Sequence, residues 1–172
     1  MNHEEEKIIN LIDLLQDQRD VKRSKVPIIF KISPDIADFE IKSLCKIFLE
    51  KKIDGIILTN TTVNNKENLG SDLKYETGGL SGKPLNTVSN KIIQKFFIQL
   101  GHDIPIIGAG GVSDGHTALE KIKSGATLLQ LYTSMVYGGP YVAHKINKEL
   151  SRLIKKEGYK NISEVVGIYC KK

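Results

Sequence analysis

The chain has 172 residues, 40% hydrophobic and 26% charged, so it has the length of one domain and can bury a core. Two cysteines at distant positions exclude a disulfide scaffold and a cysteine-based zinc site, and they suit a reducing compartment. The net charge is +5, but the lysines are spread along the chain and only three arginines accompany them, so we infer no nucleic-acid partner.

Helical and strand patterns alternate from the start of the chain. Residues 1–7 are polar and acidic, with no apolar leader, and residues 4–18 have the apolar spacing of an amphipathic helix. An apolar run at 27–33 predicts a buried strand. Residues 41–49 then carry one apolar helical face, for which Asp38 is the expected N-cap.

The same alternation continues to the end of the chain. Residues 55–60 predict a second buried strand, and a long polar segment follows at 61–84. A loop of this length inside a domain is usually a functional lid or disordered. The remaining expected elements are a helix at 88–100, a strand at 104–109, a short helix capped by Ser113 and ended by Gly125, a strand at 127–132 and a helix at 142–154.

This order predicts an α/β fold with parallel strands and right-handed crossovers. The strands are continuous apolar runs, which we expect when both faces of a sheet are covered. Two architectures remain open, a doubly wound sheet and part of a (β/α)8 barrel. A complete barrel takes about 250 residues, so this chain is too short to form one.

Unusual polar residues gather at the end of each predicted strand. Because parallel α/β folds bind ligands at the carboxyl ends of their strands, these residues predict one binding site. They are Lys31 with Ser33-Pro34-Asp35, then Thr59-Asn60-Thr61-Thr62, then Gly108-Ala109-Gly110-Gly111, and finally Tyr132-Thr133-Ser134.

Two of these groups point to an anionic or planar ligand. Lys31 lies in an apolar strand, where an ammonium either meets an anionic ligand or pairs with a carboxylate such as Asp35. The segment at 59–62 offers an amide and three hydroxyls, which suit the edge of a polar heterocycle or, alternatively, a loop turn capped by Asn60. Tyr132 either stacks on a ligand or packs in the core, and the core is the default expectation.

The glycine-rich segments have a ligand interpretation and a purely structural one. Glycines at 108–111 lie between a strand and a helix, where backbone N–H groups can hold a phosphate, but tight-turn packing also needs glycine. This is not the dinucleotide fingerprint, because Ser113 stands where a glycine is required. The segment at 78–84 allows close approach to a ligand or forms a flexible loop. The four histidines are scattered, and no metal site is expected.

Taken together, these motifs resemble the C-terminal half of the class 2, quinone-linked dihydroorotate dehydrogenases. Their order and spacing agree with that family from about residue 4 to residue 167. The strings at 78–85 and 130–133 are specific to this class and usually differ in the soluble class 1 enzymes. The matching strings are Phe30-Lys31-Ile32-Ser33-Pro34-Asp35, Ile53-Asp54-Gly55-Ile56, Thr59-Asn60-Thr61-Thr62, Thr77-Gly78-Gly79-Leu80-Ser81-Gly82-Lys83-Pro84-Leu85, Pro105-Ile106-Ile107-Gly108-Ala109-Gly110-Gly111-Val112 and Gln130-Leu131-Tyr132-Thr133.

The resemblance implies a (β/α)8 barrel of which residues 1–172 supply strands five to eight, a half barrel. It implies FMN as cofactor, oxidation of dihydroorotate to orotate in pyrimidine (UMP) synthesis, and transfer of electrons to a quinone. The implied FMN contacts are Lys31 near the reducible end, Thr59, Gly82, Gly110, Gly111, Tyr132 and Thr133, with Gly110, Gly111 and Thr133 around the phosphate. The implied substrate contacts are Asn60 and Thr61.

The main departure from the family is the catalytic serine. In the family this base lies in an Asn-x-Ser-Ser-Pro-Asn-Thr-like string after the fourth barrel strand, and no such string occurs here, so no catalytic residue is assigned. The first four strands and the N-terminal quinone-binding helices are also absent. Because a half barrel has two open edges, we expect the isolated chain neither to bind FMN tightly nor to oxidise dihydroorotate.

Three functional hypotheses follow. The chain is the FMN- and orotate-binding half of the enzyme, acting with the other half barrel; or it is an inactive remnant that serves as a binding or assembly module, for instance as a homodimer. A third, weaker hypothesis is that the chain belongs to another FMN- or phosphate-binding barrel enzyme. The strings at 59–62 and 78–82 argue against it. The expected location is cytoplasmic, or peripheral on the inner membrane in the full-length enzyme.

Overall fold

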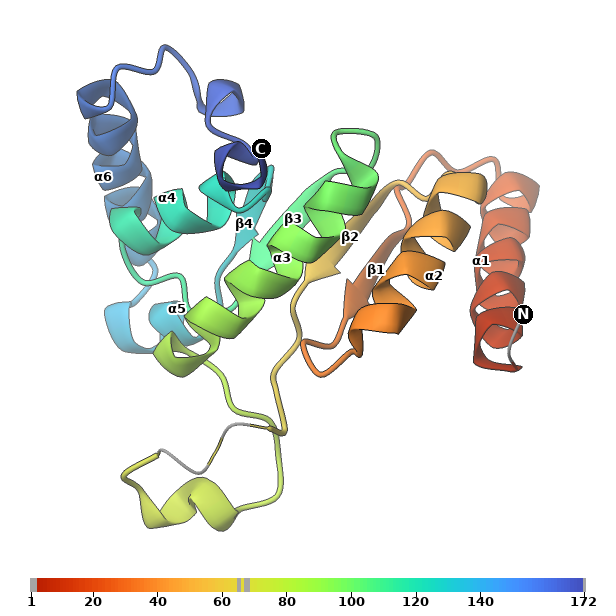
Figure 1. The fold of residues 1–172 in the computed structure, drawn as a ribbon, viewed down its shortest axis with the longest axis horizontal. Coiled ribbons are helices and arrows are strands. Elements are labelled where there is room, and N and C mark those ends of the chain that lie inside the picture. Colours follow the sequence, from red (N-terminus) through yellow and green to blue (C-terminus); the bar gives the residue numbers. More distant parts are fainter. Residues whose placement is uncertain (1–2, 65, 67–68, 172) are drawn as a thin grey trace.

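The computed structural model describes residues 3–64, 66 and 69–171 (Figure 1). Its strands and α-helices are α1 (His3–Val21), β1 (Ile29–Ile32), α2 (Asp38–Glu50), β2 (Gly55–Leu58), α3 (Asn86–Leu100), β3 (Ile106–Ala109), α4 (Gly115–Lys123), β4 (Leu128–Gln130), α5 (Thr133–Gly138) and α6 (Val142–Lys156). Single 3-10 turns are η1 (Asp72–Tyr75), η2 (Lys83–Leu85), η3 (Ile162–Glu164) and η4 (Ile168–Cys170). The predicted alternation of strands and helices is confirmed.

The strands form one parallel sheet in the order β1-β2-β3-β4. Because parallel crossovers are right-handed, strands added successively on the same side place their helices on one face of the sheet. Figure 1 shows α2 and α3 lying across the same face. A doubly wound sheet instead reverses its strand order and carries helices on both faces. The uninterrupted order therefore favours the barrel segment over the doubly wound sheet.

The main core lies between the sheet and its helices. Phe48 of α2 and Phe96 of α3 are fully buried, and they pack with Ile56 and Leu58 of β2. Burial of a side chain of this size contributes about 1.5–3 kcal/mol. A second buried cluster joins α4, α6 and the C-terminal turns, and its members include Leu119, Ile122, Ile146, Leu150 and Val165. These two clusters fix the helices behind the carboxyl ends of the strands.

The opposite face of the sheet is open. The register places Lys31, Ile57, Ile107 and Leu128 side by side on this face, and Leu128 is 61% exposed. Both faces were expected to be covered, but β1 and β4 carry exposed side chains at alternate positions. In a closed barrel this face packs against the other strands, which explains why its residues are mainly apolar.

Two helix starts differ from the prediction by one residue. Asp38 is the first residue of α2 instead of its N-cap, and Glu40 accepts a hydrogen bond from the N–H of Ala37 at 2.8 Å. The N-cap of α4 is Asp114 and not Ser113, because the carboxylate of Asp114 accepts the N–H that lies three residues further on.

The region after the fourth strand also differs. The strand ends at Gln130, and the short helix α5 follows, which the sequence did not predict. Six residues are too few to show a helical period. The expectation that Tyr132 packs in the core is wrong, since its side chain is 82% exposed at the start of α5. Among the described helices, none combines the length and the hydropathy of a membrane span.

Candidate functional site

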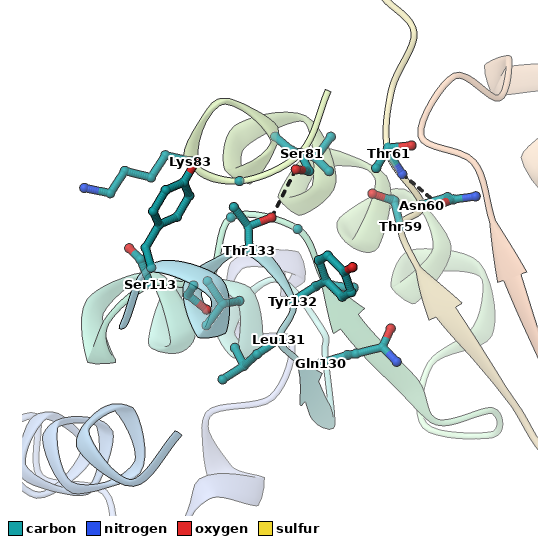
Figure 2. Close-up of a pocket in the computed structure, with 18 of the residues that line it drawn as sticks. Thr59, Asn60, Thr61, Ser81, Lys83, Ser113, Gln130, Leu131, Tyr132 and Thr133 are labelled. Carbon is teal, nitrogen blue, oxygen red and sulfur yellow. Dashed lines mark hydrogen bonds between the residues drawn. The ribbon is translucent and has the colours of Figure 1, made fainter. Parts of the chain in front are cut away.

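A cleft of about 760 Å³ lies at the carboxyl ends of the strands. Its volume is in the range of small-molecule sites. Figure 2 shows side chains from the ends of β2 and β4, from the segment at 81–83 and from α5 converging on it. All the residues that the resemblance implied for flavin or substrate line this cleft, namely Lys31, Thr59, Asn60, Thr61, Gly82, Gly110, Gly111, Tyr132 and Thr133.

Lys31 directs its charge toward the cleft. Its Nζ lies 3.4 Å from Oε1 of Gln130, which comes from the end of β4. The alternative pairing with Asp35 is wrong, because that carboxylate instead accepts hydrogen bonds from the loop at 62–64. Lys31 therefore has a neutral partner in the cleft, and its positive charge is free to meet an anionic ligand.

Thr59 presents a buried hydroxyl to the cleft. The residue is 3% exposed, and among the described residues its Oγ1 has no hydrogen-bond partner. Such a group costs about 1–3 kcal/mol when it stays unsatisfied, so a polar ligand atom here would remove that cost. Asn60 and Thr61 follow on the exposed side, where Oδ1 of Asn60 accepts the N–H of Thr61 at 2.9 Å (Figure 2). This contact joins adjacent residues, and residues 59–61 are not in a turn.

Gly110 and Gly111 form the turn after β3. Their φ angles are 102° and 74°, a region that glycine adopts without strain. A Cβ on Gly111 would lie 2.5 Å from Cβ of Asn86, and one on Gly110 would lie 2.9 Å from Cδ2 of Leu85. The loop is therefore a tight turn packed on the start of α3, and it also presents backbone instead of side chains to the cleft.

The N-terminus of α4, which follows this loop, is already capped. Oδ1 of Asp114 accepts hydrogen bonds from the N–H of Thr117 at 2.8 Å and from its hydroxyl at 2.9 Å. Burial alone would raise the pKa of Asp114, but the hydrogen bonds from Thr117 and Ser113 outweigh it and lower the pKa. An anion in the cleft would therefore meet the glycine loop and not the end of α4.

The long polar loop is closed at its base beside the cleft. Thr62 and Leu80 form an antiparallel bridge with N···O distances of 3.2 and 2.7 Å. Beyond the bridge, Oγ1 of Thr133 donates to Oγ of Ser81 at 3.0 Å (Figure 2). A Cβ on Gly82 would lie 3.1 Å from Cγ2 of Thr133. These contacts hold Gly82 and Thr133 together in the wall of the cleft.

Comparison with known proteins shows which family shares these features. The dihydroorotate dehydrogenase family model matches residues 5–154. The mitochondrial dihydroorotate dehydrogenase (quinone) of Mus musculus is 40% identical over 159 residues. The dihydroorotate dehydrogenase (quinone) of Mesorhizobium japonicum is 41% identical over 160 residues. The chain belongs to the dihydroorotate dehydrogenase family.

Its relatives place the chain in the quinone-dependent class of dihydroorotate dehydrogenases. The crystal structure of ligand-free DHODH from Eimeria tenella matches 84% of the chain with a TM-score of 0.80 and 37% identity. The alignment with the mouse protein covers 92% of this chain and 40% of the mouse protein. The alignment with the Mesorhizobium protein covers 93% of this chain and 45% of that protein, and the match with the Eimeria structure covers 40% of the Eimeria chain. The chain thus spans less than half the length of these dihydroorotate dehydrogenases.

Some residues of the cleft were given no individual role from the sequence. Oγ of Ser134 is buried, and it has no hydrogen-bond partner in the part of the chain that the structure describes. Gln130 approaches Lys31, and Ser81 binds Thr133. The available signal was the strings themselves, since Ser81 adjoins Gly82, Ser134 adjoins Thr133, and Gln130 opens the string that contains Tyr132 and Thr133.

Other reactive side chains of this family member lie outside the cleft. Burial raises the pKa of the Cys45 thiol to about 12, so it is not a nucleophile at neutral pH. Cys170 is also away from the cleft, and burial raises its pKa as well. Across the described ranges, the structure has no cluster of three histidine, cysteine or acidic residues that would hold a metal.

Proposed function

We propose that this chain supplies the FMN- and orotate-binding half of a quinone-dependent dihydroorotate dehydrogenase. In this proposal residues 1–172 correspond to strands five to eight of the family barrel. The observation that carries it is the convergence in one cleft of the nine residues implied for flavin and substrate, which lie in separate parts of the sequence. The catalytic serine, the first four strands and the quinone site then belong to the other half of the barrel.

The side chains and backbone of the cleft fit an FMN molecule. A side chain at Gly110 or Gly111 would clash with residues at the start of α3, so this loop presents only backbone to the cleft. Backbone N–H groups suit a phosphate. The unpartnered hydroxyl of Thr59 suits a polar atom of the ring. Lys31 would stabilise negative charge near the reducible end of the flavin. Bound FMN would supply the two-electron acceptor for the substrate.

The remaining contacts place the substrate and the rest of the flavin. Asn60 and Thr61, which stand exposed beside Thr59, would hydrogen-bond the ring and amide groups of dihydroorotate or orotate. Gly82, Tyr132 and Thr133 would contact FMN from the opposite wall. This chain then binds and orients both ligands, while the base that removes the substrate proton comes from the other half barrel.

The isolated chain provides the first test. We expect it to be colourless after purification and inactive with dihydroorotate and a quinone, because the cleft lacks one wall. NMR titration with FMN should detect weak binding at the glycine loop. Retention of yellow flavin together with dehydrogenase activity would contradict the assignment as a half site.

A pair of glycine variants makes this titration specific. Gly111→Ala introduces a Cβ 2.5 Å from Asn86 at φ 74°, whereas Gly139→Ala meets no atom within 4 Å at φ 69°. The second variant therefore carries a similar backbone strain without the clash. We expect Gly111→Ala to abolish the weak FMN binding and Gly139→Ala to retain it.

The alternative function is an assembly module without catalysis. The observation in its favour is the open sheet face, where Leu128 is 61% exposed and Ile29 is 38% exposed. If two copies pair through this face, light scattering will give the mass of a dimer, and FMN will have no effect on it. A monomer that binds FMN at the glycine loop would favour the enzyme half.

A further inference from the structure

A charged side chain is buried directly behind the glycine loop. Lys121 of α4 is 0% exposed and lies outside the lining of the cleft. A Cβ on Gly108 would lie 2.7 Å from its Cδ, so the side chain packs closely against β3. Burying an ammonium is costly unless hydrogen bonds compensate. The hydrogen bonds of Lys121 must therefore offset this cost.

The first contact leads to the start of the glycine loop. Nζ of Lys121 donates to Oγ of Ser89 at 3.0 Å. Oγ of Ser89, which is itself fully buried, donates to the carbonyl oxygen of Ala109 at 2.6 Å. This arm ends on the peptide group that joins Ala109 to Gly110.

The second contact leads to the end of the same loop. Nζ of Lys121 donates to Oδ1 of Asn90 at 2.7 Å. Nδ2 of Asn90 donates to Oδ1 of Asn86 at 3.2 Å, and Nδ2 of Asn86 donates to the carbonyl oxygen of Gly111 at 3.3 Å. This arm ends on the peptide group that joins Gly111 to Val112.

Both arms come from one face of α3, because Asn86, Ser89 and Asn90 stand at helical positions i, i+3 and i+4. A peptide group is planar, so holding its carbonyl oxygen also fixes the direction of its N–H. The two arms therefore fix the peptide planes on either side of the positive-φ pair at 110–111. Glycine has no side chain with which to hold such a turn by itself.

We propose that Lys121 is a positioning residue for the glycine loop, acting through Ser89 and through Asn90 and Asn86 to hold that loop ready for the phosphate of the ligand. The proposal rests on the proposed flavin function. Burial lowers the pKa of Lys121 to about 7, with the charge of Glu120 acting in the opposite direction. The neutral amine still has two N–H donors, one for each arm, so the network persists in both charge states.

The test compares two flavins that differ only in the phosphate. FMN and riboflavin are titrated separately into the 15N-labelled full chain, and dissociation constants are taken from amide shifts. Lys121→Met keeps most of the volume and removes the hydrogen bonds by which Nζ holds Ser89 and Asn90, the start of both arms. We expect it to weaken FMN binding about tenfold, as the loss of roughly 1.4 kcal/mol implies, and to leave riboflavin binding unchanged.

Three further variants separate positioning from a loss of stability. Ser89→Ala removes one arm with the loss of a single oxygen atom, and Asn90→Ala removes the other with the loss of its carboxamide. Both variants provide the test if Lys121→Met does not fold. Each should weaken FMN binding by less than Lys121→Met does, again without effect on riboflavin. Ile122→Val destabilises the same helix without touching the network, and it should affect neither flavin.

The outcomes are distinguishable. Equal weakening of FMN and riboflavin, or no weakening of either, in the network variants would overturn the proposal. If the unaltered chain binds neither flavin, the proposed function fails, and the amide resonances of Gly110 and Gly111 still decide the positioning role. They should move in the network variants and stay in place in Ile122→Val, whereas unmoved resonances would overturn it.

Discussion

At the scale of single residues, the cleft is where the fold leaves polar groups unsatisfied. Among described residues, the buried side-chain atoms without a hydrogen-bond partner are Oγ1 of Thr59 and Oγ of Ser134, and both residues line the cleft. Native proteins pair nearly all buried polar groups, so such exceptions indicate a ligand site. Lys121 is equally buried, but its Nζ donates hydrogen bonds to Ser89 and Asn90.

Thr59→Val tests the unpaired hydroxyl. The substitution keeps the shape of the side chain and removes a polar group that has no partner in the free chain. We expect the free energy of unfolding to rise by about 1 kcal/mol, measured by urea denaturation, while FMN binding weakens. A loss of stability in the free chain would show that the hydroxyl already has a partner.

Lys121 should make stability depend on pH. Burial lowers its pKa from 10.5 to about 7 in the folded chain, so between these values the unfolded chain binds a proton that the folded chain does not. The free energy of unfolding should therefore rise with pH from about 7 to 10.5, by at most about 1.4 kcal/mol per unit. Below pH 7 both states are protonated and this contribution is flat.

Urea denaturation of Lys121→Met at several pH values isolates that contribution. The methionine does not titrate, so the rise above pH 7 should be smaller in the variant than in the unaltered chain. Parallel pH curves for the two proteins would show that Lys121 titrates near its ordinary pKa in the folded chain. The comparison cancels the other titrating groups, which both proteins share.

The strand-end residues were predictable from the sequence, and the network behind them was not. Lys31, Thr59 and Gly110 each follow or interrupt an apolar run, so their position at the binding edge follows from parallel strand topology. Lys121 lies on a helix, where a lysine usually faces solvent. Its burial depends on how α4 packs against α3 and β3, which no local pattern records.

At the scale of elements, Asp35 joins the first strand–helix connection to the long loop. Its carboxylate accepts hydrogen bonds from the hydroxyl of Thr62, from the N–H of Val63 at 2.9 Å and from Nδ2 of Asn64 at 3.0 Å. Asp35 therefore fixes the loop start together with the backbone bridge between Thr62 and Leu80, while the N–H of Asn60 donates to the carbonyl oxygen of Ile32 at 2.9 Å.

Asp35→Ala should release the loop. We expect the free energy of unfolding to fall by about 1–3 kcal/mol and limited trypsin digestion to cut faster after Lys66 or Lys74. Asp38→Ala is the matched control, because Asp38 forms a surface ion pair with Lys95 that contributes at most about 1 kcal/mol. Equal digestion of the two variants would show that Asp35 does not anchor the loop.

The long elements were predictable because their apolar periods span several turns or a whole strand. Phe48 and Phe96, for example, belong to helical patterns that the structure confirms. The N-caps at Ala37 and Asp114 were each misplaced by one residue. Ser113 and Asp114 are both polar and only the local geometry decides between them, whereas Ala37 has no capping side chain for a pattern to detect. The six-residue helix α5 has no period to detect.

At the scale of the whole molecule, the four-stranded sheet is open and does not close into a barrel. Its strands run in sequence order with one face against helices and the other bearing exposed apolar side chains such as Leu128. The sequence alone left a doubly wound sheet possible, because both architectures share the same order of elements along the chain. Strand order in space, which distinguishes them, depends on contacts between distant residues.

The open face leads to the central claim, that the cleft is a flavin half site completed by another half barrel. The direct test mixes this chain with the first four strand–helix units of a full-length relative, such as the mouse protein, in the presence of FMN, followed by gel filtration with flavin absorbance. We predict a one-to-one complex that retains FMN, while each half alone loses it. Retention of FMN by this chain alone, or a mixture without flavin, would contradict the claim.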